Sequence, residues 1–285
     1  MRDRIVQANG VGLCAETFGD PADPALLLIH GAGNSMLSWD AGLCERLAAG
    51  GRLVVRYDMR DAGRSVSYAP GAPEYALRDL VADAVGLLDA LGVVRAHVVG
   101  MSTGGTIGQL LALDHAGRVA SLTLASTTPG IPGEEGSDLP GVTPELSASF
   151  ASEPAEPDWA DREAVIDYLV EAERPFAGRV FDEAAMRDVA GRVFDRTANV
   201  ASSATNVFRI DAGPPWRERL GRIAAPTLVI HGTGDPLFPL EHGRALADEI
   251  PGAELLPVEG MGHEYFPPAS WDLVVPAILR LGASR

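Results

Sequence analysis

The stretch AHVVGMSTGG, residues 96–105, decides the fold class of this chain. The apolar run Ala96–Gly100 suits a buried strand and leads directly into Gly100-Met101-Ser102-Thr103-Gly104, where a helical pattern begins. A sharp turn from strand to helix strains the serine backbone and projects its hydroxyl from the edge of a sheet, and the flanking glycines avoid a Cβ clash. The letters G-x-S-x-G recur by chance. Their place between a strand and a helix predicts that Ser102 is a nucleophile.

The sequence on both sides of this stretch alternates between strand and helix patterns. A hairpin is expected from Arg4–Ala8 and Val11–Phe18, which flank the turn dipeptide Asn9-Gly10. The alternation predicts an α/β fold, with a mostly parallel eight-stranded sheet covered by helices on both faces. The other expected strands are Ala25–His30, Arg52–Tyr57, Ala96–Gly100, Val119–Ala125, 226–232 and Ala253–Val258, and the expected helices are Trp39–Ala49, Tyr75–Leu91, Thr103–Asp114, Leu240–Ile250 and Trp271–Leu281.

The alternation stops between residues 128 and 222. The part from Thr128 to Trp159 is rich in Pro, Gly, Ser and Glu and is expected to be irregular. An insertion of this length can form a lid. We therefore predict one α/β core from residues 1–127 and 223–285, interrupted by a helical cap at residues 128–222. Its expected helices are Asp161–Ala172, Phe181–Asp195 and Ser202–Asp211.

The composition excludes several classes of protein. The chain has 285 residues, 46% hydrophobic and 22% charged, which is enough apolar material for a core. All 23 basic residues are arginine, so a lysine Schiff base and a complete phosphate-binding P-loop are ruled out. The net charge of −16 argues against binding to nucleic acid or to an anionic membrane.

The compartment is expected to be the cytoplasm. The first residues, MRDRIVQANG, lack the apolar stretch of a signal peptide, and no apolar run is long enough to span a bilayer. The two cysteines, Cys14 and Cys44, have no metal-ligand spacing and are expected to be buried free thiols. We expect no metal site and no cofactor.

A nucleophilic serine needs a base and an acid that orients the base. Of the six histidines, His263 is favoured because it lies in a loop after the last strand, in the chain order Ser…acid…His. Asp235 follows the strand 226–232 and precedes His263 by one strand–helix–strand unit, so both are expected at the same sheet edge. His242 begins a helix, where we expect a capping or surface role. The remaining histidines lie far from Ser102 or shape loops: His30, His97, His115 and His231.

The oxyanion of acyl transfer needs preorganised N–H donors, each worth about 3 kcal/mol. The amide of Thr103 is one predicted donor. The amide of Ala32, in the small-residue loop 30–34, is the other. Substrate contacts are expected from residues that flank these motifs, namely Gly31, Met36, Trp39, Met101, Phe238 and Tyr265.

The motifs together resemble the α/β-hydrolase fold family. The segments HGAGNSMLSW, YDMRDAGRS, HVVGMSTGG, PTLVIHGTGDPLFP and VEGMGHE occur in the family's order. Within its serine esterase branch, GDPADPALLL, RYDMRDAGRS and ALDHAGRVASLTL are most similar to the polyketide methylesterases of the aclacinomycin type. The likeness fades between about Pro129 and Leu220, the part that would choose the substrate.

The resemblance implies a catalytic triad of Ser102, Asp235 and His263, an oxyanion hole at Ala32 and Thr103, and a helical cap. A family loop signature is also matched, which we interpret as structural, by Asp58, Arg60, Gly63 and Ser65.

The leading hypothesis is therefore a serine-dependent carboxylic ester hydrolase that works through an acyl-enzyme. Its expected partner is a small to medium apolar ester, of which a polyketide methyl ester is one. A cofactor-free haloperoxidase or perhydrolase uses the same triad and stays open, as does a non-catalytic ligand receptor on the same fold. A dehalogenase is disfavoured because it would carry Asp where Ser102 stands.

Overall fold

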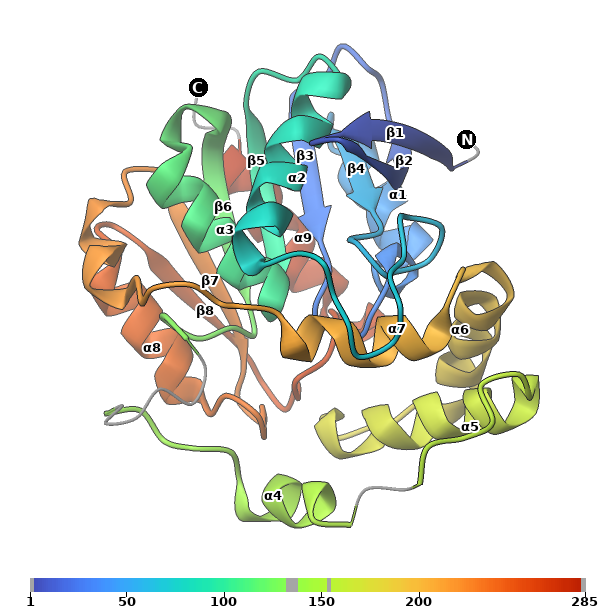
Figure 1. Ribbon diagram of the computed structural model, residues 1–285. Helices are drawn as coiled ribbons and strands as arrows, with labels where there is room; N and C mark the ends of the chain where they lie inside the picture. Colours follow the sequence, from blue (N-terminus) through green and yellow to red (C-terminus); the bar gives the residue numbers. More distant parts are fainter. Residues whose placement is uncertain (1–2, 132–137, 153–154, 283–285) are drawn as a thin grey trace.

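The computed structural model describes residues 3–131, 138–152 and 155–282. These residues form an eight-stranded sheet in the order β1-β2-β4-β3-β5-β6-β7-β8 (Figure 1). β1 pairs antiparallel with β2 and β2 with β4, whereas all further neighbours are parallel. The strands are β1 (Arg4–Ala8), β2 (Val11–Phe18), β3 (Ala25–Ile29), β4 (Leu53–Tyr57), β5 (Ala96–Met101), β6 (Val119–Ala125), β7 (Thr227–Gly232) and β8 (Glu254–Val258).

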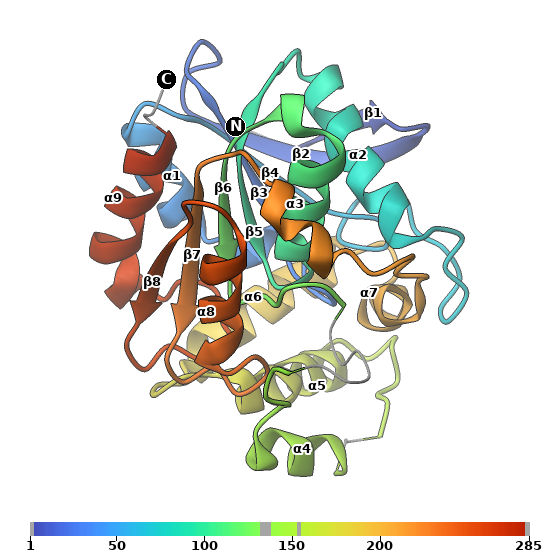
Figure 2. The same cartoon turned by 90° about the vertical axis from the view of Figure 1, so that its left-hand side faces the viewer.

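Helices cover both faces of the sheet, which confirms the predicted fold class. α2 (Leu77–Ala90), α3 (Thr103–Asp114) and α8 (Leu240–Glu249) lie on one face, and α1 (Ala41–Ala49) and α9 (Trp271–Gly282) lie on the other (Figure 2). Each face has its own hydrophobic core. The ends of these strands and helices lie within two residues of those predicted from the pattern.

The core elements form where local sequence and burial agree. In α2 the apolar positions Leu80, Val81 and Leu87 follow helical spacing and are at most 2% exposed. Burying each such side chain contributes roughly 1.5–3 kcal/mol. The β1–β2 hairpin turns at Asn9 and Gly10, which both have positive φ, as a two-residue turn requires.

The segment between β6 and β7 crosses the end of the sheet where the parallel strands finish (Figures 1 and 2). Its helices are α4 (Pro144–Phe150), α5 (Arg162–Glu173), α6 (Glu183–Arg196) and α7 (Val200–Thr205). The position beyond the carboxyl ends of the strands is where a cap would lie, and the cap boundaries stay a prediction. Part of this segment, residues 132–137 and 153–154, lies outside the described residues.

Two expectations for this segment were wrong. α4 lies in the stretch predicted to be irregular, because Thr143 caps it by accepting the Leu146 amide and Leu146 is 1% exposed. Proline at the first helical position, Pro144, also suits a helix start. The predicted helix Ser202–Asp211 is in fact the short α7 followed by a 3-10 turn, η4 (Asn206–Arg209).

Two further features concern thiols and membranes. Cys14 and Cys44 are free and buried, as predicted. Burial raises the pKa of both thiols to about 12, so neither is a thiolate at neutral pH. In the described part of the chain, no helix is both long and apolar enough to cross a membrane.

Candidate active site

Ser102 stands at the turn between β5 and α3 with φ 52° and ψ −116°. A residue with a side chain rarely adopts this left-handed region, and the strain marks the position as special. The glycines on either side are required by close packing. A Cβ at Gly100 would collide with the carbonyl of Gly104, and a Cβ at Gly104 would collide with the carbonyl of Ile29. The turn therefore projects the Ser102 hydroxyl into the space beyond the strand ends.

Asp235 and His263 meet in the neighbouring loops, after β7 and β8. His263 Nδ1 and Asp235 Oδ2 are 2.9 Å apart, and the Asp235 side chain is fully buried. The other oxygen of Asp235 accepts the amides of Leu237 at 3.0 Å and Phe238 at 2.8 Å. Burial by itself raises the pKa of this carboxyl, but the charge of His263 and its hydrogen bond outweigh burial and leave the pKa below the ordinary value. An ionised Asp235 places the imidazole proton on Nδ1 and leaves Nε2 to accept a proton.

The Ser102 hydroxyl has no hydrogen bond to His263 among the described residues. Hydrogen bonds between a nucleophile and its base often form or shorten only when a substrate binds, so a missing Ser102–His263 bond in the substrate-free protein is compatible with a catalytic pair. The ring of His263 packs against two aromatic side chains, with centroid distances of 5.3 Å to Phe238 and 6.0 Å to Phe176.

The loop after β3 brings Ala32 to the same cavity as Ser102 and Thr103. Neither predicted oxyanion donor, the Ala32 amide or the Thr103 amide, is used in a hydrogen bond within the described residues. Asn34 donates to the carbonyl of Ala32 at 3.1 Å, and to Glu173 of α5 at 3.4 Å. These contacts hold the loop while leaving the two amides available.

His30 and Tyr265 also hold the loop that carries Ala32. His30 Nε2 accepts the Met59 amide at 3.0 Å, so its Nδ1 carries the proton and donates to the Gly31 carbonyl at 2.8 Å. The Tyr265 hydroxyl accepts the Gly31 amide at 2.8 Å. His30 therefore shapes the loop, as predicted from its place before a glycine.

A cavity of about 1450 Å³ opens over Ser102. Residues of the core and residues of the segment between β6 and β7 line it together. Pockets for drug-sized molecules are about 300–1,000 Å³, so this cavity admits a larger ligand. Residues that line it include Ala32, Ser102, Thr103, Thr106, Thr128, Pro129, Ile131, Asp138, Leu139, Pro140, Val142, Val207, Phe208, Arg217, Leu237, Phe238, His242 and Glu249.

Of the predicted substrate-binding residues, Phe238 lines the cavity and Gly31 lies beside Ser102, since a Cβ on Gly31 would be 3.4 Å from the Ser102 Cβ. The structure buries the other apolar ones, with at most 3% exposure: Met36, Trp39 and Met101. Tyr265 packs edge-on against Trp39 at 5.0 Å, with its hydroxyl on the Gly31 amide. Nearness in sequence to a motif does not tell which way a side chain points.

His242 differs from its predicted capping or surface role. It is 7% exposed and forms part of the cavity wall. One ring nitrogen is 2.8 Å from Thr128 Oγ1 and the other is 2.8 Å from the Pro140 carbonyl. Burial lowers the pKa of His242, so the ring is neutral. No local signal could have indicated these contacts, because the partners are over 100 residues away in sequence.

Sequence reasoning missed Arg217, and it named Phe208 only as one of several aromatic residues in the segment that could line a pocket; both line the cavity from the segment between β6 and β7. Phe208 is 69% exposed, and a Cβ on Gly33 would be 3.7 Å from its ring. Arg217 forms ion pairs with Asp138 and with Glu249 of α8. The aromatic composition of the segment was the only available signal, and it did not distinguish Phe208 from residues that pack helices together.

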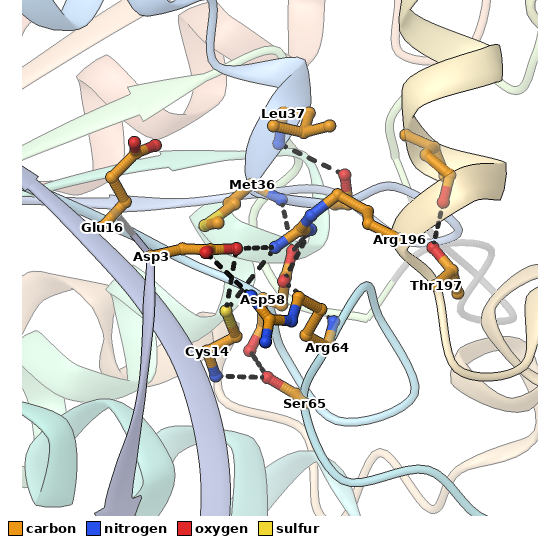
Figure 3. Close-up of polar contacts among 12 residues, drawn as sticks. Asp3, Cys14, Glu16, Met36, Leu37, Asp58, Arg64, Ser65, Arg196 and Thr197 are labelled. Atoms are coloured by element: carbon orange, nitrogen blue, oxygen red, sulfur yellow. Dashed lines mark hydrogen bonds and ion pairs between the residues drawn. The ribbon is translucent and has the colours of Figure 1, made fainter. Parts of the chain in front are cut away.

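Asp58, predicted to be structural, joins the loop after β4 to α6 (Figure 3). Its buried carboxylate is 2.7 Å from Arg196 of α6 and accepts the Met36 amide at 3.0 Å. Arg196 also pairs with Asp3 at 3.1 Å (Figure 3). Ser65 donates to the Asp58 carbonyl at 2.6 Å. These contacts bind the N-terminal segment, the core and α6 together.

Comparison with known proteins places the chain in a family. A family model of the alpha/beta hydrolase fold matches residues 24–268. The chain is 37% identical over 283 residues to rhodomycin D methylesterase DauP of Streptomyces sp. (strain C5), and 36% identical over 283 residues to rhodomycin D methylesterase DnrP of Streptomyces peucetius. Each match covers 92% of both chains.

The fold also matches a solved structure, that of the enol-lactonase from Burkholderia xenovorans LB400. The sequences are 26% identical, and the TM-score is 0.74 over 98% of this chain and 99% of that one. The resemblance found in the sequence motifs is thereby confirmed. With a strained serine at the turn after β5 and a family model that covers most of its length, the chain belongs to the α/β-hydrolase fold family.

Proposed function

We propose that this protein is a serine-dependent carboxylic ester hydrolase with the triad Ser102, His263 and Asp235. The observation that carries the proposal is the Asp235–His263 hydrogen bond of 2.9 Å, located in loops next to a serine held at positive φ. The methylesterase activity in the names of its two relatives supports an ester as the substrate class.

The proposed reaction has two halves. Ser102 Oγ attacks the ester carbonyl while His263 Nε2 takes its proton, and the same proton then goes to the departing alcohol. The acyl-enzyme is hydrolysed by water that His263 activates. Asp235 holds the imidazole in the required tautomer and stabilises its charged form. Its lowered pKa keeps it ionised throughout.

The negative charge on the carbonyl oxygen is stabilised by the amides of Ala32 and Thr103. Both line the cavity with Ser102 and neither is occupied within the described residues. Thr103 is also the first residue of α3, where the helix dipole favours an anion. Removing one such donor typically costs about 3 kcal/mol.

The substrate we propose is the bulkiest kind that the sequence analysis named: a multi-ring ester such as a polyketide methyl ester. A cavity of about 1450 Å³, whose mixed lining includes the apolar side chains of Ile131, Phe208 and Phe238, supports this choice. The relatives named for rhodomycin D support the same class. Hydrolysis would yield the free acid and methanol.

The test compares wild type with Ser102→Ala, and with Ser147→Ala on the exposed face of α4 as the control. The substrates are p-nitrophenyl esters from acetate to decanoate and a polyketide methyl ester, with the free acid and methanol measured by mass spectrometry. We expect turnover in wild type and Ser147→Ala, and a loss of at least about 1,000-fold in Ser102→Ala. Turnover that survives in Ser102→Ala would reject the triad.

The same enzymes separate the two alternatives. Halide oxidation that depends on acetate and peroxide, without ester turnover, would favour a perhydrolase. Saturable ligand binding by folded wild type without any turnover would favour a receptor. We expect neither.

A further inference from the structure

The loop that carries His263 is packed, backbone to backbone, against a segment between α5 and α6. His263 N donates to the Phe176 carbonyl at 2.8 Å, and Arg179 N donates to the Gly260 carbonyl at 3.0 Å. We call residues 176–179 the clamp segment and residues 259–264 the histidine loop. About 80 residues separate it from the histidine loop in sequence, yet it contacts the backbone of that loop at Gly260 and at His263 itself.

Glycines make this approach possible. A Cβ on Gly178 would collide with the Gly260 carbonyl and would lie 2.6 Å from Glu264 Oε1. A Cβ on Gly262 would collide with the Phe176 carbonyl. Real Cβ atoms essentially never approach other atoms this closely, so both positions need glycine if the two segments are to stay together.

Glu264 connects the two segments through one oxygen. Its Oε1 accepts the Gly262 amide of its own loop at 3.0 Å and the Gly178 amide of the clamp segment at 3.0 Å. Glu264 is partly buried and directly follows His263. A carboxylate that accepts two backbone amides forms charge-assisted hydrogen bonds, which are stronger than neutral ones.

We propose that Glu264 is a positioning residue, which locks the histidine loop to the clamp segment and so places the His263 imidazole for proton transfer. This inference rests on the proposed function. Asp235 fixes the ring at Nδ1, whereas the clamp fixes the backbone on which the ring stands. A base must be placed to within about 0.5 Å, and a misplacement of about 1 Å can cost about 100-fold in rate. Glu264 acts through His263 and does not contact the reacting atoms.

A second carboxylate provides a matched comparison. Glu259 also joins the histidine loop to the clamp segment, through an ion pair of 2.6 Å with Arg179. Its side chain is 73% exposed and that of Arg179 is 72% exposed. Exposed ion pairs contribute little, so loss of Glu259 should be tolerated where loss of Glu264 is not.

The experiment measures kcat per titrated active site, KM, and the rate constant for phosphonylation of Ser102 by a fluorophosphonate. In Glu264→Ala we expect kcat and the phosphonylation constant to fall together by about 10- to 100-fold, with KM within about twofold. Glu264→Gln keeps an oxygen that accepts both amides, so its kcat should stay within about threefold of wild type. Glu259→Ala should stay within about twofold.

A variant on the clamp side keeps the inference testable if Glu264→Ala does not fold. Gly178→Ala should force the clamp segment away and lower kcat to a similar extent. Gly221→Ala, whose added Cβ would meet no atom within 4 Å, is its control and should keep wild-type kcat.

The inference fails if Glu264→Ala lowers only the melting temperature or the number of active sites while kcat per site is unchanged. It also fails if Glu264→Gln loses as much as Glu264→Ala, since the charge rather than the acceptor would then be needed. Turnover in Ser102→Ala would instead overturn the proposed function, so the two failures can be told apart.

Discussion

Ser102 combines a strained backbone with a hydroxyl that has no hydrogen-bond partner in the part of the chain that the structure describes. The left-handed conformation of a residue with a side chain costs about 1–3 kcal/mol. Three hydrogen bonds hold it there: its amide donates to the Ala125 carbonyl at 3.0 Å, and its carbonyl accepts the Thr106 amide at 3.1 Å and the Thr127 hydroxyl at 2.9 Å. The neighbouring residues thus fix the backbone of Ser102 and leave its side chain available for the proposed chemistry.

Phe208 should affect binding of bulky esters only. Its ring lies over Gly33 at the cavity wall and is 69% exposed, so a multi-ring substrate would cover it. We expect Phe208→Ala to raise KM for a polyketide methyl ester about tenfold, equivalent to about 1.4 kcal/mol, with kcat unchanged. KM for p-nitrophenyl acetate should not change. Steady-state kinetics on both esters checks this.

Phe150→Ala is the control for that measurement, because Phe150 is also exposed, at 43%, but is not among the cavity-lining residues. An equal rise in KM for acetate and for the bulky ester would contradict a role for Phe208 in recognising size.

Helix α6 forms an ion pair with the core at its C-terminal end. Arg196, its last residue, forms the ion pair with Asp58 shown in Figure 3, in which the Asp58 side chain is fully buried and that of Arg196 is 14% exposed. Asp58 also holds the Met36 amide, close to the oxyanion loop. The position of α6 and the shape of that loop therefore depend on the same carboxylate.

Removing the arginine should destabilise the fold. Arg196→Ala leaves the Asp58 charge buried without its cationic partner, so we expect a loss of about 3 kcal/mol in the free energy of unfolding, measured by urea denaturation. Arg192→Ala, on the same helix, breaks only an exposed pair with Asp188 and should cost less than about 0.5 kcal/mol. Equal losses in the two variants would show that the Asp58 pair is not special.

The folded protein encloses several neutral histidines. Burial lowers the pKa of His30, His97, His231 and His242, and that of His97 to about 3. His97 lies on β5 with Nε2 2.8 Å from Thr123 Oγ1 and is 3% exposed. Each of these rings can take up a proton more readily in the unfolded chain than in the folded one.

The free energy of unfolding should therefore decrease as the pH is lowered below about 6.5. Because the folded pKa of His97 is lowered, the unfolded state binds the proton first, and each pH unit between about 6.5 and about 3 costs about 1.4 kcal/mol for this residue. We expect His97→Gln to reduce the slope of the unfolding free energy against pH by about 1.4 kcal/mol per pH unit, which corresponds to one proton fewer taken up on unfolding. Urea denaturation from pH 5 to 7.5 checks this.

Thr123→Ala is the control for this slope. It removes the hydrogen-bond partner but keeps the titrating ring, so it should lower stability at every pH while retaining the wild-type slope. An unchanged slope in His97→Gln would contradict the enclosed neutral histidine.

Local patterns were sufficient for the fold and for the predicted triad positions. The strand Ala96–Met101 and helix Thr103–Asp114 are coded by adjacent residues, and Ser102 sits at their junction because its neighbours at 100 and 104 are glycines. Parallel strands all end at one edge, so the loops that follow them can be assigned to one site before any distance is known. α4 is one exception, because its capping signal at Thr143 lies in a stretch with loop-like composition. The helix predicted over Ser202–Asp211, which is the short α7 followed by η4, is another.

Tertiary packing alone decided which residues surround the site. His242, Arg196 and Glu264 each have partners between 86 and 193 residues away in sequence. No periodicity encodes such pairs, because each depends on where an irregular segment returns to the sheet. The size of the cavity over Ser102 depends on the same packing, since its walls come from both the core and the segment between β6 and β7. The proposed chemistry can thus be predicted from short motifs, whereas the shape of the cavity depends on contacts between distant parts of the chain.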